Sequence, residues 1–364
     1  MSPRMHVPTS FDAHISDLIM GLAVPSIIFI VLILGAYAWA AWNPVSRPHL
    51  NRVSFRLLVY ALIANLAYAV GMISGTKLKA GAACNGSTFF YNSCLMFAGV
   101  MFFSMALNLQ LVLVHGVNGQ KMEKYYILGA ILLTLACNVP PYAAGALGFW
   151  ELNATCWFNS PDPAVQLRWF VGTQGFWMFL MSTCEVIVFL TIVLSARVRA
   201  VISGSDMPAF PQPSITTPPL ALNRKMILRI GLYPLFSCFL NITGAILDLH
   251  TVLDPSFTEV NWRLGIVDLL IYDLRPLMYA TLAVADPSFL RALRALRHPE
   301  LEAQFIALQS RATAGNTWLS GGIRSTVGQT FQNGDTDSGI KTPGGQSVSE
   351  SMNAGSAVEL TRQI

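Results

Sequence analysis

The stretch that decides the fold is residues 18–42, LIMGLAVPSIIFIVLILGAYAWAAW, which contains no charged residue. As a helix, an apolar run of this length crosses the ~30 Å hydrocarbon core of a bilayer. It is too long for the apolar core of a cleavable signal peptide, and the residues before it are polar and mixed. We therefore expect a membrane helix that stays in the mature protein.

Further apolar runs of the same kind follow along the chain. They cover about residues 55–75, 88–114, 126–149, 169–194, 226–249 and 264–284. Only helices and closed barrels satisfy every backbone group in lipid, and these runs are too long for barrel strands. The composition agrees, because 53% of the 364 residues are hydrophobic and only 12% are charged, against about 25% charged in soluble domains. The predicted fold is all-α, a bundle of seven transmembrane helices.

The remaining segments divide the chain into four parts. Residues 1–16 form an N-terminal segment, residues 17–285 the bundle, and residues 286–305 a short amphipathic helix at the membrane surface. In that helix Phe289, Leu290, Leu293 and Leu296 share one side, and arginines occupy another. Residues 306–364 are rich in Ser, Thr, Gly, Asn and Gln, which predicts a disordered tail.

The distribution of Lys and Arg predicts the orientation, because inner loops carry an excess of positive charge. With the N-terminus outside, the inner side holds Arg47, Arg52, Arg56, Lys121, Lys124, Arg197, Arg199, Arg224, Lys225, Arg229, Arg291, Arg294 and Arg297. The outer side then holds Arg4, Lys77, Lys79, Arg168 and Arg263. We expect a multi-pass protein of the plasma membrane with an extracellular N-terminus and a cytoplasmic C-terminus.

Two glycosylation sequons agree with this orientation. Asn85-Gly-Ser and Asn153-Ala-Thr both fall in predicted outer loops, so Asn85 and Asn153 are candidate glycosylation sites.

Cysteines on the outer side allow a disulfide. Cys84 precedes the third run and Cys156 lies in the second outer loop, where the environment is oxidising. Cys94 is a competing partner that lies deeper in the membrane, and two free thiols are the simpler alternative. The spacing of the cysteines does not match a metal site, and we expect no metal or other cofactor.

The chain resembles the secretin-like (family 2) and cyclic-AMP-receptor-like G-protein-coupled receptors of fungi and related lower eukaryotes. The resemblance covers about residues 15–300 and rests on the spacing of Cys84 and Cys94, on the pair Cys156-Trp157, and on residues 106–126, ALNLQLVLVHGVNGQKMEKYY. It implies a Cys84–Cys156 disulfide, a ligand that binds outside, and a heterotrimeric G protein inside. Secretin-like hormone receptors also carry a disulfide-rich outer domain, whereas residues 1–16 contain no Cys. We therefore do not expect capture of a peptide hormone.

The seventh run contains unusual charges for a membrane segment. Asp268, Tyr272, Arg275 and Tyr279 share one helical side, and charges at membrane depth usually face a bundle interior. Arg275-Pro-Leu-Met-Tyr279 partly matches the Asn-Pro-x-x-Tyr motif of rhodopsin-like receptors, with Arg in place of Asn. Pro276 and Tyr279 are therefore candidates for a conformational switch, and a static buried ion pair is the alternative.

Glu185 in the fifth run needs a partner, for which Arg275 is a candidate, while Asp268 or Asp273 could pair with Arg275 instead. The candidate ligand-pocket residues are Gln174, Trp177, Glu185, Asp268, Tyr272 and Arg275. Ordinary helix packing is the alternative interpretation of these side chains. Asp248 and His250 are interpreted as marking the water boundary of the sixth run.

The residues expected to face a G protein are Lys121, Lys124, Arg197, Arg199, Arg224, Lys225 and Arg229. Positive-inside topology alone is the alternative explanation for them. The predicted function is a receptor that senses an extracellular small molecule, and a transporter or channel is the alternative, although the chain lacks paired halves. No Lys occurs in residues 264–284, which excludes a retinal Schiff base there. We expect neither an enzyme nor a nucleic-acid-binding protein.

Overall fold

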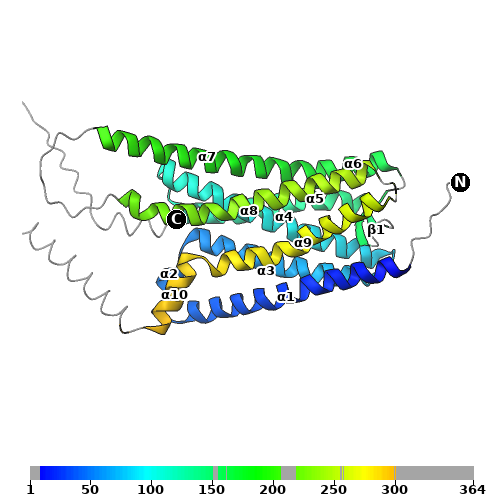
Figure 1. Cartoon of the computed structure of the whole chain (residues 1–364), viewed down its shortest axis with the longest axis horizontal. Helices are drawn as coiled ribbons and strands as arrows, with labels where there is room; N and C mark the ends of the chain where they lie inside the picture. The colour runs from blue at the N-terminus through cyan, green and yellow to red at the C-terminus, as the bar shows by residue number, and fades with distance from the viewer. Residues whose placement is uncertain are drawn as a thin grey trace, which may run out of the picture.

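The computed structural model describes residues 9–150, 155–160, 162–205, 219–254, 256, 258–298 and 300. Long helices lie side by side along one axis, and a short hairpin lies at one end of the bundle (Figure 1). The elements are α1 Thr9–Trp42, α2 Arg47–Leu50, α3 Val53–Gly75, α4 Ala82–His115, α5 Gly119–Ala143, β1 Leu147–Trp150, β2 Thr155–Phe158, α6 Pro163–Phe170, the π-helical turn η1 Val171–Gly175, α7 Phe176–Ser205, α8 Pro219–Leu253, α9 Glu259–Val284 and α10 Pro287–Arg297.

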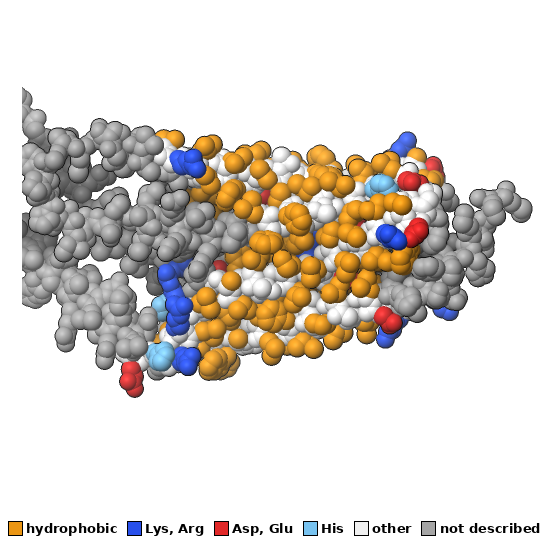
Figure 2. Space-filling view, in the orientation of Figure 1, with side chains coloured by type: hydrophobic (Ala, Val, Ile, Leu, Met, Phe, Trp, Pro, Cys, Tyr) orange, Lys and Arg blue, Asp and Glu red, His pale blue; other side chains and the backbone are white. Residues whose placement is uncertain are grey.

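In the part of the chain that the structure describes, six helices are long and apolar enough to cross a membrane. They are α1, α3, α4, α5, the continuous helix from α6 through α7, and α8. Large apolar side chains such as Leu32, Trp39, Leu132 and Phe239 are exposed on the outside of the bundle. Figure 2 shows the apolar band that such side chains form, with Lys and Arg gathered at its ends. The protein is therefore a multi-pass helical membrane protein.

The helix α9 lies within the same bundle but differs in composition. It packs against α1, α3 and α8. Asp268, Asp273 and Arg275 lie along it, and these charges set it apart from the six helices that qualify by composition.

The helix α4 lies at the centre of the packing and contacts α3, α5, α7 and α8. Its side chains Met101, Phe102 and Met105 are almost completely buried, together with Leu58 and Leu62 of α3. The helix α1 closes the arrangement by packing against both α3 and α9. Every helix therefore turns one side to the core and another to the surroundings.

The closest packing of α3 on α4 occurs at a glycine. A Cβ atom added to Gly71 would lie 3.0 Å from Tyr91 Cβ and 3.2 Å from Phe90 Cδ1. Because the Cβ atom of Tyr91 is fixed to its backbone, a side chain at position 71 fits only if α3 and α4 move slightly apart. The glycine thus sets the distance between the two helices at this level.

The predicted fourth run ends too late. The helix α5 ends at Ala143 rather than near residue 149. Pro140 and Pro141 occupy its last turn, and Gly145 adopts a left-handed conformation with φ of 68°. The apolar residues that follow form β1, which pairs antiparallel with β2 in the register Leu147↔Phe158. The prediction of an all-α fold missed this hairpin.

Several helices begin earlier than their apolar runs. The helix α1 begins at Thr9, α4 at Ala82 and α8 at Pro219. Apolar composition marks only the part of a helix that contacts lipid, whereas the hydrogen-bonded helix continues into polar sequence. The predicted boundaries were therefore too narrow at these ends.

The helix α10 lies across the end of the bundle opposite the hairpin (Figure 1). Phe289, Ala292 and Ala295 are buried, and Arg291, Arg294 and Arg297 are exposed. Phe289 stacks on Phe55 of α3 with ring centroids 6.2 Å apart. Of the predicted apolar side, Phe289 is buried, whereas Leu290, Leu293 and Leu296 are only half-buried. Residues 301–305 of the predicted range, like the predicted tail 306–364, lie outside the described residues.

We expect Gly71→Ala to destabilise the bundle by about 1–3 kcal/mol, because the new methyl group would force α3 away from α4. The measurement is thermal unfolding of the purified protein in detergent. Gly129→Ala is the matched control, since an added Cβ there meets nothing within 4 Å on the outer side of α5. Equal melting temperatures for the two variants would contradict the close approach.

Candidate functional site

The β1–β2 hairpin is anchored over one end of the bundle. A disulfide joins Cys84 of α4 to Cys156 of β2, with Cα atoms 5.5 Å apart, as the sequence predicted. The Tyr91 hydroxyl donates to the carbonyl of Cys156, and the Gln166 amide donates to the carbonyl of Phe158 at 2.9 Å. The hairpin is therefore fixed both to α4 and to α6.

Aromatic side chains hold the hairpin from below. The Trp157 ring lies 5.0 Å from that of Trp150 and 5.6 Å from that of Phe170, measured between centroids. Leu147, Phe158 and Phe170 are buried in the same cluster. The hairpin thus packs as part of the protein interior and covers what lies beneath it.

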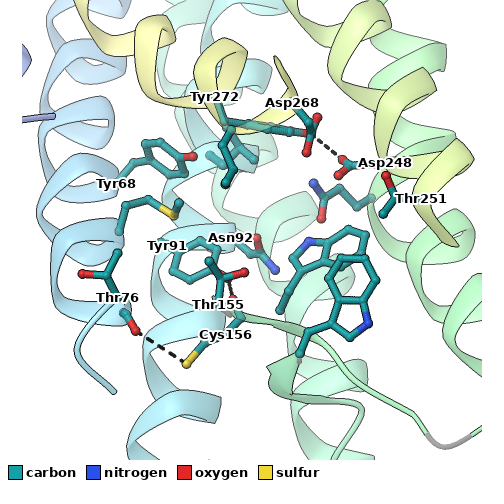
Figure 3. A pocket seen from close by; sticks show the side chains of 17 residues that line it. Tyr68, Thr76, Tyr91, Asn92, Thr155, Cys156, Asp248, Thr251, Asp268 and Tyr272 are labelled. Atoms are coloured by element: carbon teal, nitrogen blue, oxygen red, sulfur yellow. Dashed lines mark hydrogen bonds between the residues drawn. The ribbon is translucent and has the colours of Figure 1, made fainter. Parts of the chain in front are cut away.

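A cavity lies beneath this hairpin, between α3, α4, η1, α8 and α9 (Figure 3). The space between its lining residues is about 670 Å³, with the open solvent at its mouth included. Its aromatic lining is Tyr68, Tyr91, Trp150, Trp157 and Tyr272, and its polar lining includes Asn92, Gln174, Asp248, Thr251 and Asp268. A mostly apolar wall with a few polar groups is typical of a ligand site.

Two carboxyl groups lie on the same wall of this cavity. Figure 3 shows Asp248, Asp268 and Tyr272 close together, across the cavity from Tyr68 and Tyr91. The Tyr272 hydroxyl donates to Asp248 Oδ2 at 2.6 Å. Asp268 Oδ1 is buried without a hydrogen-bond partner. The Tyr272–Asp248 hydrogen bond therefore joins α9 to α8. Asp268 Oδ1 remains able to accept a hydrogen bond.

The position of the Tyr272 ring depends on a second glycine. A Cβ atom added to Gly244 would lie 3.2 Å from the Tyr272 hydroxyl and ring. The backbone of α8 can approach the ring only because this residue has no side chain. The hydroxyl consequently reaches Asp248, one turn further along α8.

A second cavity of about 350 Å³ lies deeper in the bundle. It shares Asn92, Leu95 and Gln174 with the first, and it is also lined by Asn241 and Arg275. The Arg275 guanidinium carbon lies 5.0 Å from the centroid of the Tyr272 ring, which is a cation–π distance. Polar groups therefore continue from the hairpin towards the middle of the bundle.

The predicted pocket residues fall into three groups. Gln174, Asp268 and Tyr272 line the first cavity, and Gln174 and Arg275 line the second. Trp177 packs against the central core, and Glu185 is buried at 1% exposure, so neither lines a cavity. Both remain part of the packing around the site.

Asp248 is the residue that sequence reasoning misjudged. Its position near the end of the sixth run was interpreted as the water boundary, but it is 5% exposed and lines the cavity. Its spacing from Asn241 and Gly244, which lie seven and four residues earlier, was the available signal, because these positions share one helical side. His250, by contrast, is exposed.

The predicted pair of Glu185 and Arg275 is not in direct contact. Both Glu185 carboxylate oxygens, and Arg275 Nε and Nη2, are buried without hydrogen-bond partners. The two side chains are nevertheless close enough to interact electrostatically. Arg275 also forms no ion pair with Asp268 or Asp273 in the described part of the chain.

The predicted switch residues are both buried in α9. Tyr279 stacks on Phe102 of α4 with ring centroids 3.9 Å apart, and Pro276 lies within the helix one residue after Arg275. Movement of the lower half of α9 would therefore have to separate Tyr279 from α4.

The opposite end of the bundle contains basic and acidic groups at the junction of α9 and α10. Burial raises the pKa of Asp286, while hydrogen bonds from Ser288 and the charge of Arg52 act against this rise. Burial also lowers the pKa of Arg52, with the neighbouring Arg291 acting in the same direction. The Tyr233 hydroxyl donates to the carbonyl of Leu282 at 2.8 Å. Arg52, which precedes α3, and Tyr233 of α8 therefore both interact with residues at the junction of α9 and α10.

Of the candidate G-protein-facing residues, Lys121, Lys124 and Arg197 are exposed at this end. The side chains of Arg199, Arg224, Lys225 and Arg229 lie outside the described part of the structure.

Of the two candidate glycosylation sites, the structure describes Asn85 but not Asn153. Asn85 lies in the first turn of α4 rather than in a loop. Its amide is placed to donate to the carbonyl of Leu147 at 2.9 Å. Asn153 lies outside the described residues. Cys94, the competing disulfide partner, is a free thiol.

Comparison with known proteins does not identify the chain. No family model matches it, and no curated protein matches it either. The function proposed below therefore depends on the residues and the geometry of these two ends of the bundle.

We expect Arg275→Gln to lower the free energy of unfolding by about 3 kcal/mol, because it leaves Glu185 without a nearby cation. Glu185→Gln should be destabilising as well, and the double variant should lose roughly 1 kcal/mol less than the sum of the two. Thermal unfolding and surface expression measure this coupling. Arg263→Gln is the control, because Arg263 lies on the exposed side of the same helix. Additive losses would show that the two charges do not interact.

Proposed function

We propose that the protein is a G-protein-coupled receptor with seven transmembrane helices, of which α9 is the seventh. It binds a small molecule from outside at the hairpin end and activates a heterotrimeric G protein at the other end. The protein performs no chemistry on the ligand, because binding alone shifts the population of bundle conformations. The observation that carries this proposal is the cavity beneath the disulfide-bonded hairpin.

The hairpin end suits the outside of a cell for two reasons. Its Cys84–Cys156 disulfide needs an oxidising compartment. The cavity lies at this end and adjoins the deeper cavity through shared residues such as Gln174. A ligand that enters here would contact α4, α8 and α9 together, so its binding energy would depend on how these helices are arranged.

The other end suits the cytoplasm. Exposed basic residues, including Lys121, Lys124 and Arg197, surround it, which agrees with the positive-inside rule. The amphipathic α10 places its arginines on the solvent side of this end, where they can meet anionic lipid headgroups. A G protein would bind between α5, α7 and α8 at this rim.

The helix α9 is the element most suited to connect the two ends. Its upper half contributes Asp268 and Tyr272 to the cavity, and its lower half packs Tyr279 on Phe102. Pro276 lies between these halves and removes one backbone hydrogen bond. A ligand at Asp268 can therefore bend α9 at Pro276 and change the packing below it.

One observation favours a transporter or channel as the second candidate. The two cavities share three lining residues, and the deeper one reaches Arg275 in the middle of the bundle. A path of polar groups of this kind also suits a translocated ion or metabolite. Flux of a ligand into proteoliposomes, without activation of a G protein, would favour this candidate.

The crossing of α9 predicts that residues before and after it are accessible from opposite sides. Single cysteines at Ala80 and Ser256 should react with a membrane-impermeant maleimide on intact cells, whereas a cysteine at His298 should react only after permeabilisation. All three positions are exposed, so the difference reports the membrane and not local burial. Labelling of Ser256→Cys and His298→Cys from the same side would contradict a seventh crossing.

The coupling itself can be tested with purified components. Nucleotide exchange on a heterotrimeric G protein should increase when the chain is reconstituted in nanodiscs with a metabolite library. Reversing the charges of Lys121 and Lys124 to Glu should lower this rate by about tenfold, because close charge pairs at interfaces contribute more than 1 kcal/mol. Lys77 and Lys79 reversed in the same way are the matched control on the outer side. Equal exchange rates in both double variants would contradict a G-protein site at the inner rim.

A further inference from the structure

We propose that the cavity beneath the hairpin binds a small organic ammonium ion with an aromatic or aliphatic body, which Asp268 and Asp248 hold by its charge. This inference rests on the proposed receptor function and names the chemical class of its ligand.

Among the described residues, the buried part of the bundle contains more carboxyl groups than cations. Among the described side chains, the buried carboxyl groups in its middle and outer parts are those of Glu185, Asp248, Asp268 and Asp273, and the buried cation there is Arg275. Buried carboxylates require compensation by a cation or by hydrogen-bond donors. Arg275 lines the deeper cavity, where its charge acts on Glu185, and its charge also acts on Asp248 and Asp268, but its side chain does not line the first cavity. The Asp248–Asp268 pair therefore has no cation of its own among the residues that line the upper cavity.

Several polar atoms in the cavity wall have no hydrogen-bond partner. Asp268 Oδ1 and Gln174 Oε1 are acceptors without a donor, at residues that are 6% and 9% exposed, and Asn92 Nδ2 is a donor without an acceptor. Asp248 already accepts from the Tyr272 hydroxyl, which leaves Asp268 as the freer carboxyl group. An ammonium group has three donors and no acceptor, so it matches a carboxylate and an amide oxygen at once. An anionic ligand would instead meet two carboxyl groups of its own sign.

The rest of the cavity lining includes several aromatic side chains. Tyr272 contacts the acidic pair, Tyr68 and Tyr91 lie across the cavity from it, and Trp150 and Trp157 lie on the hairpin side. Tyr68 and Tyr91 meet edge to face with centroids 6.2 Å apart. Aromatic faces attract cations and bury an apolar body at the same time. The lining therefore fits one charged end and one apolar body better than a polar sugar or a nucleotide phosphate.

The test compares amines with alcohols of the same carbon skeleton. The probes are phenethylamine, tryptamine and cyclohexylethylamine, each against its alcohol, added at millimolar concentration to the purified chain in nanodiscs. Because a ligand that binds the folded state raises its melting temperature, we expect at least one amine to do so saturably and its alcohol to have no effect. This comparison uses the unaltered chain, so it does not depend on the folding of any variant.

Variants then locate the charge that the amine recognises. Asp268→Asn keeps the shape of the side chain and should weaken amine binding by about tenfold or more, since a charge-assisted hydrogen bond is lost. Asp248→Asn should weaken it less, because Tyr272 already donates to that carboxyl group. Glu259→Gln is the matched control, because it removes one negative charge near the same end of α9 from an exposed side chain. It should leave amine binding unchanged.

Three results would overturn the inference. They are the absence of stabilisation by every amine, equal stabilisation by an amine and its alcohol, and equal amine binding in Asp268→Asn and Glu259→Gln. The receptor proposal fails separately. An amine that binds through Asp268 but does not raise nucleotide exchange on a G protein would keep the site and exclude the signalling role.

Discussion

Charges on α9 that cannot face lipid determine how the bundle is arranged. Asp268, Asp273 and Arg275 are at most 6% exposed, whereas Val260 and Val267 of the same helix are 65% and 44% exposed. A membrane helix with one charged side and one apolar side packs among other helices with its charged side inward. The packing of α9 against α1, α3 and α8 satisfies this requirement, and it places the charged side of α9 where the two cavities lie.

The interior consequently differs in character along its length. Around Met101, Phe102 and Met105 of α4, the core consists mainly of packed apolar side chains. Towards the hairpin, carboxyl, amide and hydroxyl groups replace these side chains and leave a cavity. Close packing resists change of shape, whereas a polar cavity accommodates a ligand. One half of the bundle is thus closely packed, and the other half contains the cavity.

The sequence predicted six helices that the structure shows to be long and apolar enough to cross a membrane, because apolar length is a local property, as residues 18–42 illustrate. It also identified Asp268 and Tyr272, since their shared helical side can be read from spacing alone. It placed the end of the fourth run too late, because apolar residues such as Leu147 serve equally well in a strand packed on Trp157. Asp248 was misjudged because its burial depends on Tyr272, which lies on another helix. The spacing of Asp248 from Asn241 and Gly244 indicates a shared side of α8, but it does not say which side chain of another helix lies against that side.

The close approach of α8 to the Tyr272 ring has a consequence for how this sequence can evolve. Any side chain at position 244 must displace the ring, and with it the hydroxyl that holds Asp248. Positions 244, 248 and 272 are therefore sterically coupled, and a larger residue at position 244 is compatible with the fold only when position 272 changes as well.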